Sequence, residues 1–140
     1  MKKSLLVVLL LSAFGIQSSC GRQVEPPLPG AWLTDQYSGL ISGKRLAVVA
    51  NQTSMVGKSH LVDTLKRLGY DIRAIFAPEH GFRGMADAGG HIEDGRDPST
   101  GIPVISLYGK HFKPRREDLE GIDAVLFDIQ DVGARFYTYI

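Results

Sequence analysis

Four short apolar runs after residue 43 dominate the pattern of the chain and predict β-strands. In each run apolar residues occupy consecutive positions, and Gly, Asn or Pro lies at or near the ends. Strands that are covered on both faces have this pattern, whereas apolar and polar residues alternate along a strand that has one face exposed to solvent. The runs are RLAVVA (45–50), YDIRAIFA (70–77), IPVISLYG (102–109) and DAVLFDIQ (123–130).

Helical patterns lie before and between these runs. Residues 32–41 have the apolar spacing of a short amphipathic helix, and NQTSMVGK (51–58) is a polar loop. From Ser59 four apolar residues share one helical face, and Gly69 follows its end. A third short helix is predicted at 114–120, with Pro at its first turn. This alternation predicts an α/β fold: a Rossmann-like parallel sheet with flanking helices.

Residues 1–19 have the pattern of a secretory signal peptide. Two lysines precede the apolar run SLLVVLLLSAFGI, and small residues lead to Cys20. This single cysteine stands where a bacterial lipoprotein leader is cut, although Gln17 departs from the usual aliphatic residue. We therefore expect export, lipidation of Cys20, and anchoring to a bacterial membrane that faces the periplasm or the exterior. The alternative is an ordinary secreted protein with one free thiol.

The remaining chain divides into two parts. Residues 20–30 are polar and proline-rich, which is typical of an extended tether, and 31–140 would form the Rossmann-like domain. The last ten residues, DVGARFYTYI, read as the start of a helix. We therefore expect the sequence to be the N-terminal part of a longer protein, truncated before a C-terminal domain.

Charge and missing motifs limit the partners. The chain has 16 Lys and Arg against 15 Asp and Glu, and loss of Lys2 and Lys3 with the leader leaves −1. No block of basic residues occurs, so nucleic acid is not expected as a partner. No G-x-G-x-x-G follows the first strand, the first P-loop glycine is missing, and His91-Ile92-Glu93 lacks the cysteine pair of a deaminase zinc site. We expect no cofactor and no metal, with a His/Asp/Glu site in the long loop as an unspecific alternative.

Polar and titratable residues follow all four predicted strands. The segments are NQTS, PEHGFRG, LYGK and DIQDVGARFYTY. In an open parallel sheet, ligands bind outside the carboxyl ends of the strands, where these segments meet. The loop at 79–101 is long and contains six glycines, so it is either functional or a mobile surface loop.

Three residues of this loop are candidates for chemistry. Glu79 follows a proline and an apolar strand, and a carboxyl group partly withdrawn from water can donate a proton near neutral pH. Its alternative role is to cap backbone N–H groups. His80 could be an acid, a base, a hydrogen-bond donor or a packing residue. Arg83 could bind an anionic substrate group, or pair with Glu79 or a nearby Asp.

The fourth strand and its exit supply further candidates. Asp128 and Gln130 point to the same side of an extended strand, and Asp131 begins the next turn. They could hold a sugar hydroxyl or a water, or Asp128 could cap a neighbouring loop. Asn51 begins the loop after the first strand, and Arg135, Tyr137 and Tyr139 would line the turn after the fourth strand. The two tyrosines could stack on a sugar or belong to the core.

Several blocks, in this order and spacing, carry a family resemblance. FAPEHGFRG, DPSTGIPVISLYGK, the KP before the short helix, and DAVLFDIQDVGARFYTYI resemble the exo-β-N-acetylmuramidase (NamZ) family of bacterial glycoside hydrolases. The resemblance runs from about Gly43 to Ile140. It implies a Rossmann-like N-terminal domain, a smaller C-terminal domain, and an active cleft between them. The implied activity removes terminal N-acetylmuramic acid from the non-reducing end of peptidoglycan fragments.

The resemblance also implies roles for residues. Glu79 matches the family's leading catalytic candidate. Other positions match its motifs as site residues: His80, Arg83, Asp128, Gln130, Asp131 and Arg135. Glycoside hydrolysis needs an acid and a second group, which could be Asp128, Asp131, a residue of the C-terminal part or the acetamido oxygen of the substrate. Arg83 or Arg135 would bind the lactyl carboxylate.

Two other functions are compatible with the sequence. One is a non-catalytic lipoprotein module that binds cell-wall fragments through the arginines and aromatics. The other is a sugar-phosphate or nucleotide enzyme, which the missing phosphate loop disfavours.

Overall fold

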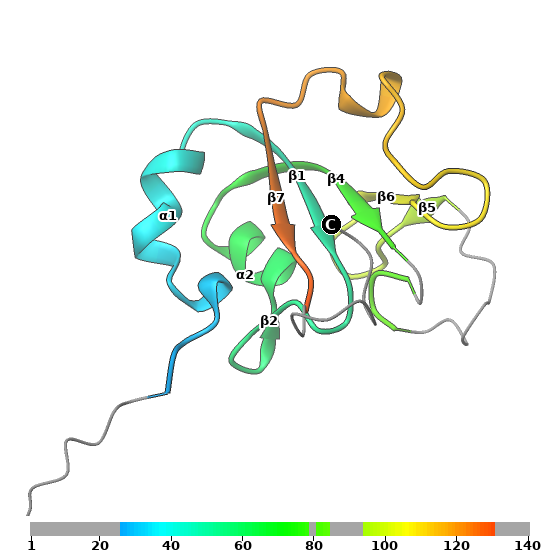
Figure 1. The fold of residues 1–140 in the computed structure, drawn as a ribbon. Helices are drawn as coiled ribbons and strands as arrows, with labels where there is room; N and C mark the ends of the chain where they lie inside the picture. The colour runs from blue at the N-terminus through cyan, green and yellow to red at the C-terminus, as the bar shows by residue number, and fades with distance from the viewer. Residues whose placement is uncertain (1–25, 79–80, 85–93, 131–140) are drawn as a thin grey trace, which may run out of the picture.

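Five strands form one sheet, in the order β5-β6-β4-β1-β7 (Figure 1). The computed structural model describes residues 26–78, 81–84 and 94–130. Four strands run parallel, and the short edge strand β5 pairs antiparallel with β6. The strands are β1 (Arg45–Ala50), β4 (Asp71–Ala77), β5 (Gly95–Arg96), β6 (Pro103–Ser106) and β7 (Ala124–Asp128).

Helices and a small hairpin complete the described part. The chain enters through η1 (Gly30–Trp32) and α1 (Thr34–Ile41). After β1, the strands β2 (Met55–Val56) and β3 (Ser59–His60) pair as a hairpin and lead directly into α2 (Leu61–Arg67). The 3-10 turn η2 (Glu117–Leu119) lies in the connection from β6 to β7.

The two faces of the sheet carry separate apolar clusters, because side chains alternate along each strand. Both α-helices pack on the first face, where Leu46, Val48 and Ile75 are fully buried. Ala47 and Phe76 belong to the second face, which is packed by partly buried residues around β6 and before β7. Apolar side chains on both faces explain why the strands have consecutive apolar residues.

The edge strand β7 departs from that pattern. Ala124 and Leu126 pack against the first cluster, whereas Val125 and Phe127 are each about half exposed, at 49% and 48%. The four predicted parallel strands and the α/β class are confirmed. The prediction that both faces of every strand are covered is wrong for β7 in the part of the chain that the structure describes.

The predicted polar loop at 51–58 is partly wrong, because Met55 and Val56 pair with Ser59 and His60. Gly57 has a φ of 61°, which the hairpin turn requires and which glycine adopts without strain. Two residues on each side are too few to show a strand pattern in the sequence. The hairpin also moves the start of the second predicted helix from Ser59 to Leu61.

The helix predicted at 114–120 is wrong: the structure has only the 3-10 turn η2. A helix of seven residues is not stable without an apolar face that packs on the fold. Leu119 is the one large apolar residue in the segment, and it is 40% exposed. Asp118 instead accepts a hydrogen bond from the Arg115 N–H at 2.8 Å and pairs with its guanidinium, which favours a turn. The antiparallel strand β5 was not predicted either.

No helix among residues 26–78, 81–84 and 94–130 is long and apolar enough to span a membrane.

Candidate functional site

The direction of the chain across the sheet reverses at β1. From β1 the chain passes through α2 to β4 and then outward to β6, whereas β7 returns to the other side of β1. Figure 1 shows β1 between β4 and β7, with all three pointing the same way. In open α/β sheets the ligand crevice lies outside the carboxyl ends of the strands at such a reversal. The candidate site is therefore the edge formed by the segments after β1, β4 and β7.

Hydrogen bonds join the segment after β1 to the end of β7. The Ser54 hydroxyl donates to the main-chain carbonyl of Asp128, and the Gln130 N–H donates to Thr53 Oγ1 at 3.3 Å. Thr53 is held in turn by Asn51 Oδ1, which accepts its N–H at 2.9 Å and its hydroxyl at 2.7 Å. The structure thus brings together three residues from the sequence analysis: Asn51, Asp128 and Gln130.

Asp128 is a half-buried carboxyl group at this edge. Burial raises the pKa of Asp128, and this effect outweighs the nearby Ser54 hydroxyl, which lowers it. A carboxyl group whose pKa moves toward neutral pH is a better proton donor or a stronger base than an exposed aspartate. Asp128 can therefore take part in proton transfer or bind a polar group of a ligand.

His60 is a buried histidine whose two ring nitrogens are both used. Nε2 lies 2.9 Å from the Asn51 carbonyl oxygen, and Nδ1 accepts the Val62 N–H at 3.2 Å. These partners assign the proton to Nε2. Burial lowers the pKa of His60 more than its hydrogen bond to the Asn51 carbonyl raises it, so the ring is neutral. It packs edge-on against Phe82, with the ring centroids 4.4 Å apart, and its role is structural.

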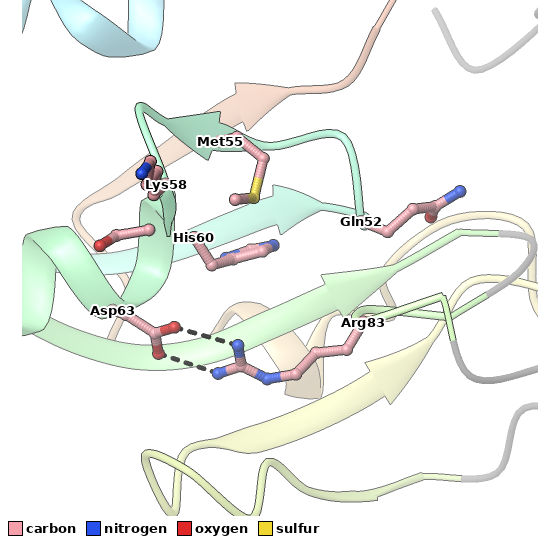
Figure 2. Close-up of a pocket in the computed structure, with 7 residues that line it drawn as sticks. Gln52, Met55, Lys58, His60, Asp63 and Arg83 are labelled. Atoms are coloured by element: carbon pink, nitrogen blue, oxygen red, sulfur yellow. Dashed lines mark hydrogen bonds and ion pairs between the residues drawn. The ribbon is translucent and has the colours of Figure 1, made fainter.

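Arg83 is paired with two aspartates. Its Nε and Nη2 donate to Asp97 at 2.7 and 2.8 Å, and its Nη1 and Nη2 donate to Asp63 at 3.0 and 2.8 Å. Figure 2 shows the fork to Asp63. The alternative in which this arginine pairs with a nearby aspartate describes the structure, and most of its N–H groups are not available to a substrate carboxylate.

Sequence reasoning missed the partner Asp97, which is almost fully buried at 2% exposure. Arg83 lowers the pKa of Asp97 to about 2, with help from the hydroxyl and N–H of Thr100. The signal was the DPST stretch: Asp before Pro with Thr three residues on is typical of a turn closed by the Asp side chain. Nothing local in the sequence indicates that Asp97 also binds Arg83.

A shallow pocket of about 400 Å³ lies beside the ion pair of Arg83 and Asp63 (Figure 2). The hairpin supplies Met55, Lys58 and His60, and Arg83 lies opposite with Asp63 of α2. Gln52, the second residue after β1, completes the wall. The pocket therefore extends the candidate site from the end of β1 toward α2.

Gly84 is a test of how tightly the segment after β4 packs. Its φ is +68°, and an added Cβ would lie 2.9 Å from Gln52 Cβ. Gly101 is a matched control, with a φ of +73° and open space around an added Cβ. We expect Gly101→Ala to lower the free energy of unfolding by about 1 kcal/mol, and Gly84→Ala by about 1–3 kcal/mol more. Urea unfolding of both variants measures this; equal losses would show that the close approach is not rigid.

Several predicted residues lie outside the described part of the chain. They are Cys20, Glu79, His80, Asp131, Arg135, Tyr137 and Tyr139. Among the described residues, no group of three or more His, Cys, Asp or Glu side chains is arranged to hold a metal ion.

Comparison with protein families gives a match over most of the chain. The family model described as "Exo-beta-N-acetylmuramidase NamZ, N-terminal" matches residues 46–140. A curated relative, the peptidoglycan β-N-acetylmuramidase NamZ of Bacillus subtilis (strain 168), is 44% identical over 110 residues. That alignment covers 77% of this chain and 27% of the relative.

Solved structures agree with the fold. Two DUF1343 family proteins of Bacteroides fragilis NCTC 9343 superpose with TM-scores of 0.64 and 0.65, at 42% and 38% identity. They cover 79% and 76% of this chain, and the chain covers 27% of each. The sequence therefore spans about a quarter of the length of the relatives that it matches.

Proposed function

Because the chain belongs to the exo-β-N-acetylmuramidase NamZ N-terminal family, we propose that the protein releases terminal N-acetylmuramic acid from the non-reducing end of peptidoglycan fragments. The family match over residues 46–140 carries this proposal. The 44% identity to a peptidoglycan β-N-acetylmuramidase supports peptidoglycan as the polymer from which the substrate comes. The chain contributes the carboxyl edge of its sheet to the site.

Glu79 is the proposed general acid. It comes two residues after the fully buried Ala77 at the end of β4, which leads the chain to the carboxyl edge. Cleavage of a glycosidic bond requires protonation of the leaving oxygen, and a carboxylic acid with a raised pKa supplies this proton. His80 follows Glu79 directly in the sequence and is a second candidate for proton transfer.

Asp128 is the proposed second carboxyl group. Its raised pKa and its position at the sheet reversal support a role as base for the attacking water. In the substrate-assisted variant of the mechanism, the same carboxylate would orient the acetamido group that attacks the sugar carbon. Asn51 and Gln130 lie at the same edge and would bind sugar hydroxyls, with Asp131 and Tyr137 as further candidates.

The lactyl carboxylate distinguishes N-acetylmuramic acid from N-acetylglucosamine, so a cation is needed to recognise it. Arg83 already donates four hydrogen bonds to two aspartates. Arg135 is therefore the preferred partner of the lactyl group.

The proposal is tested with the protein expressed from its complete coding sequence. Purified muropeptides with a non-reducing N-acetylmuramic acid end are incubated with it, and free sugar is measured by mass spectrometry. We expect release of the terminal sugar only, and none from fragments that end in N-acetylglucosamine. Saturable binding of the muropeptide without released sugar would instead support the non-catalytic cell-wall-binding module.

We also propose that the protein is a lipoprotein exported through its leader. The support is the apolar run before Cys20 and the polar, proline-rich tether after it. Mass spectrometry of the wild-type protein is expected to find acyl chains on Cys20 at the N-terminus of the mature chain, and none in Cys20→Ser, which lacks the thiol that is acylated. A wild-type protein without acyl chains on Cys20 would contradict lipid anchoring at this residue.

A further inference from the structure

We propose that Arg83 is a positioning residue, which joins Asp63 and Asp97 and thereby holds the segment that leaves β4 in one conformation. The inference rests on the proposed function, because this segment supplies Glu79 and His80 to the candidate site. It assigns Arg83 a different role from the substrate-binding role that the sequence suggests, and it gives a role to Asp63 and Asp97, which the sequence analysis did not name as site residues.

The guanidinium group of Arg83 has almost no N–H donors left for a ligand. Arginine has five N–H donors, and four hydrogen bonds join Arg83 to the two aspartates at 2.7–3.0 Å. The Arg83 side chain is 24% exposed, and its Cζ lies 4.8 Å from the centre of the Phe82 ring. Hydrogen bonds to the two aspartates and the contact with the Phe82 ring leave the Arg83 side chain a single orientation. This suits a structural link better than the binding of a ligand.

Both partners of Arg83 belong to rigid parts of the fold. The Asp97 side chain is fully buried and also accepts the N–H and hydroxyl of Thr100, at 2.9 and 2.6 Å. Asp63 lies in the first turn of α2, where Val62 and Leu65 are fully buried against the sheet. The guanidinium therefore ties three elements together: α2, the turn between β5 and β6, and the segment after β4.

The residues around Arg83 are equally constrained. Phe82 is 5% exposed and packs on His60, and Gly84 approaches Gln52 too closely for a Cβ. The Gly81 N–H donates to the Pro78 carbonyl at 3.1 Å. The chain is thus fixed immediately before position 79 and immediately after position 80. Glu79 and His80 lie between these two fixed points in the sequence, and a misplacement of a catalytic group by about 1 Å costs about 100-fold in rate.

Arg83→Lys in the protein expressed from its complete coding sequence tests the role. Lysine keeps the positive charge, but its single ammonium group cannot form a pair of hydrogen bonds to each of the two aspartates. We expect kcat for N-acetylmuramic acid release to fall about 10–100-fold, with KM within about twofold of wild type. Asp97→Asn should change kcat in the same direction. A tenfold rise in KM with unchanged kcat would overturn the proposal in favour of substrate binding, and unchanged kinetics would overturn it outright.

Arg45→Lys is the matched control. Arg45 makes a similar fork to Asp123, with Nε at 2.9 Å and Nη2 at 2.8 Å, but at the amino end of β1, away from the candidate site. We expect its kcat and KM to match wild type. Losses of kcat as large in Arg45→Lys as in Arg83→Lys would show a general effect of weakened ion pairs and would overturn the positioning role.

A readout without catalysis separates this inference from the proposed function. If the wild-type protein releases no sugar, the proposed function fails, and hydrogen–deuterium exchange of the segment 77–84 decides the positioning role. We expect at least about tenfold faster exchange there in Arg83→Lys and Asp97→Asn than in wild type and Arg45→Lys. Equal exchange in all four proteins would overturn the proposal.

Discussion

Glu79→Gln is expected to lower kcat for release of N-acetylmuramic acid from muropeptides by about 10²–10⁴-fold, the usual contribution of a general acid. Glutamine keeps the shape of the side chain but has no proton to give to the leaving oxygen. The loss should be smaller on an aryl β-N-acetylmuramide, because an aryl oxide leaves with less help from an acid. Initial rates on both substrates measure the difference.

The control for Glu79→Gln is Glu120→Gln, the same substitution at an exposed residue after η2. It should leave both rates unchanged. Equal losses on the two substrates in Glu79→Gln would show that Glu79 does not act as the acid. Wild-type rates in Glu79→Gln would remove this residue from the mechanism and leave His80 as the nearest candidate.

Arg83→Met should lower the free energy of unfolding by about 3 kcal/mol at pH 7. Removing one partner of a buried ion pair costs about 3–5 kcal/mol, because the other charge stays buried. The lower value applies here because the Arg83 side chain is 24% exposed. Urea unfolding measures the change. Arg45→Met is the control: its pair with Asp123 is exposed, so we expect a far smaller change.

The destabilisation by Arg83→Met should shrink as the pH falls. In the wild-type protein the pKa of Asp97 is about 2, below its ordinary value of 3.8. The paired carboxylate therefore contributes stability above about pH 4, and this contribution is lost as the pH falls toward 2. In Arg83→Met most of this contribution is already absent at pH 7, because Asp97 has lost its charged partner. A difference between the two proteins that grows from pH 7 to about pH 3 would contradict this account of Asp97.

Local patterns were enough to predict the main strands. The runs that became β1, β4, β6 and β7 are apolar on consecutive residues, and this composition is a property of the segment itself. The helix α2 was also predicted from its local sequence, which has Lys66 and Arg67 in the last turn. The segment that became η2 has helix-compatible ends but no apolar face, so its secondary structure depended on packing that the sequence does not display.

The candidate site was only partly predictable for the same reason. Polar residues after the strands indicated which edge of the sheet carries the chemistry, and Asn51, Asp128 and Gln130 lie there. The choice of partner for Arg83 was not predictable. Asp63 and Asp97 lie 20 and 14 residues away in the sequence, on opposite sides of it, and only the folded chain brings them together.

By itself, the sequence determined the α/β class, the order of the strands along the chain and the family, because these depend on apolar spacing and on contiguous motifs. The tertiary structure decided the reversal of the sheet at β1, the pairing of β5 and the commitment of Arg83 to two aspartates. Such pairings depend on which distant segments become neighbours, and the free energy of a hydrogen bond or an ion pair is set by burial and geometry that exist only after folding.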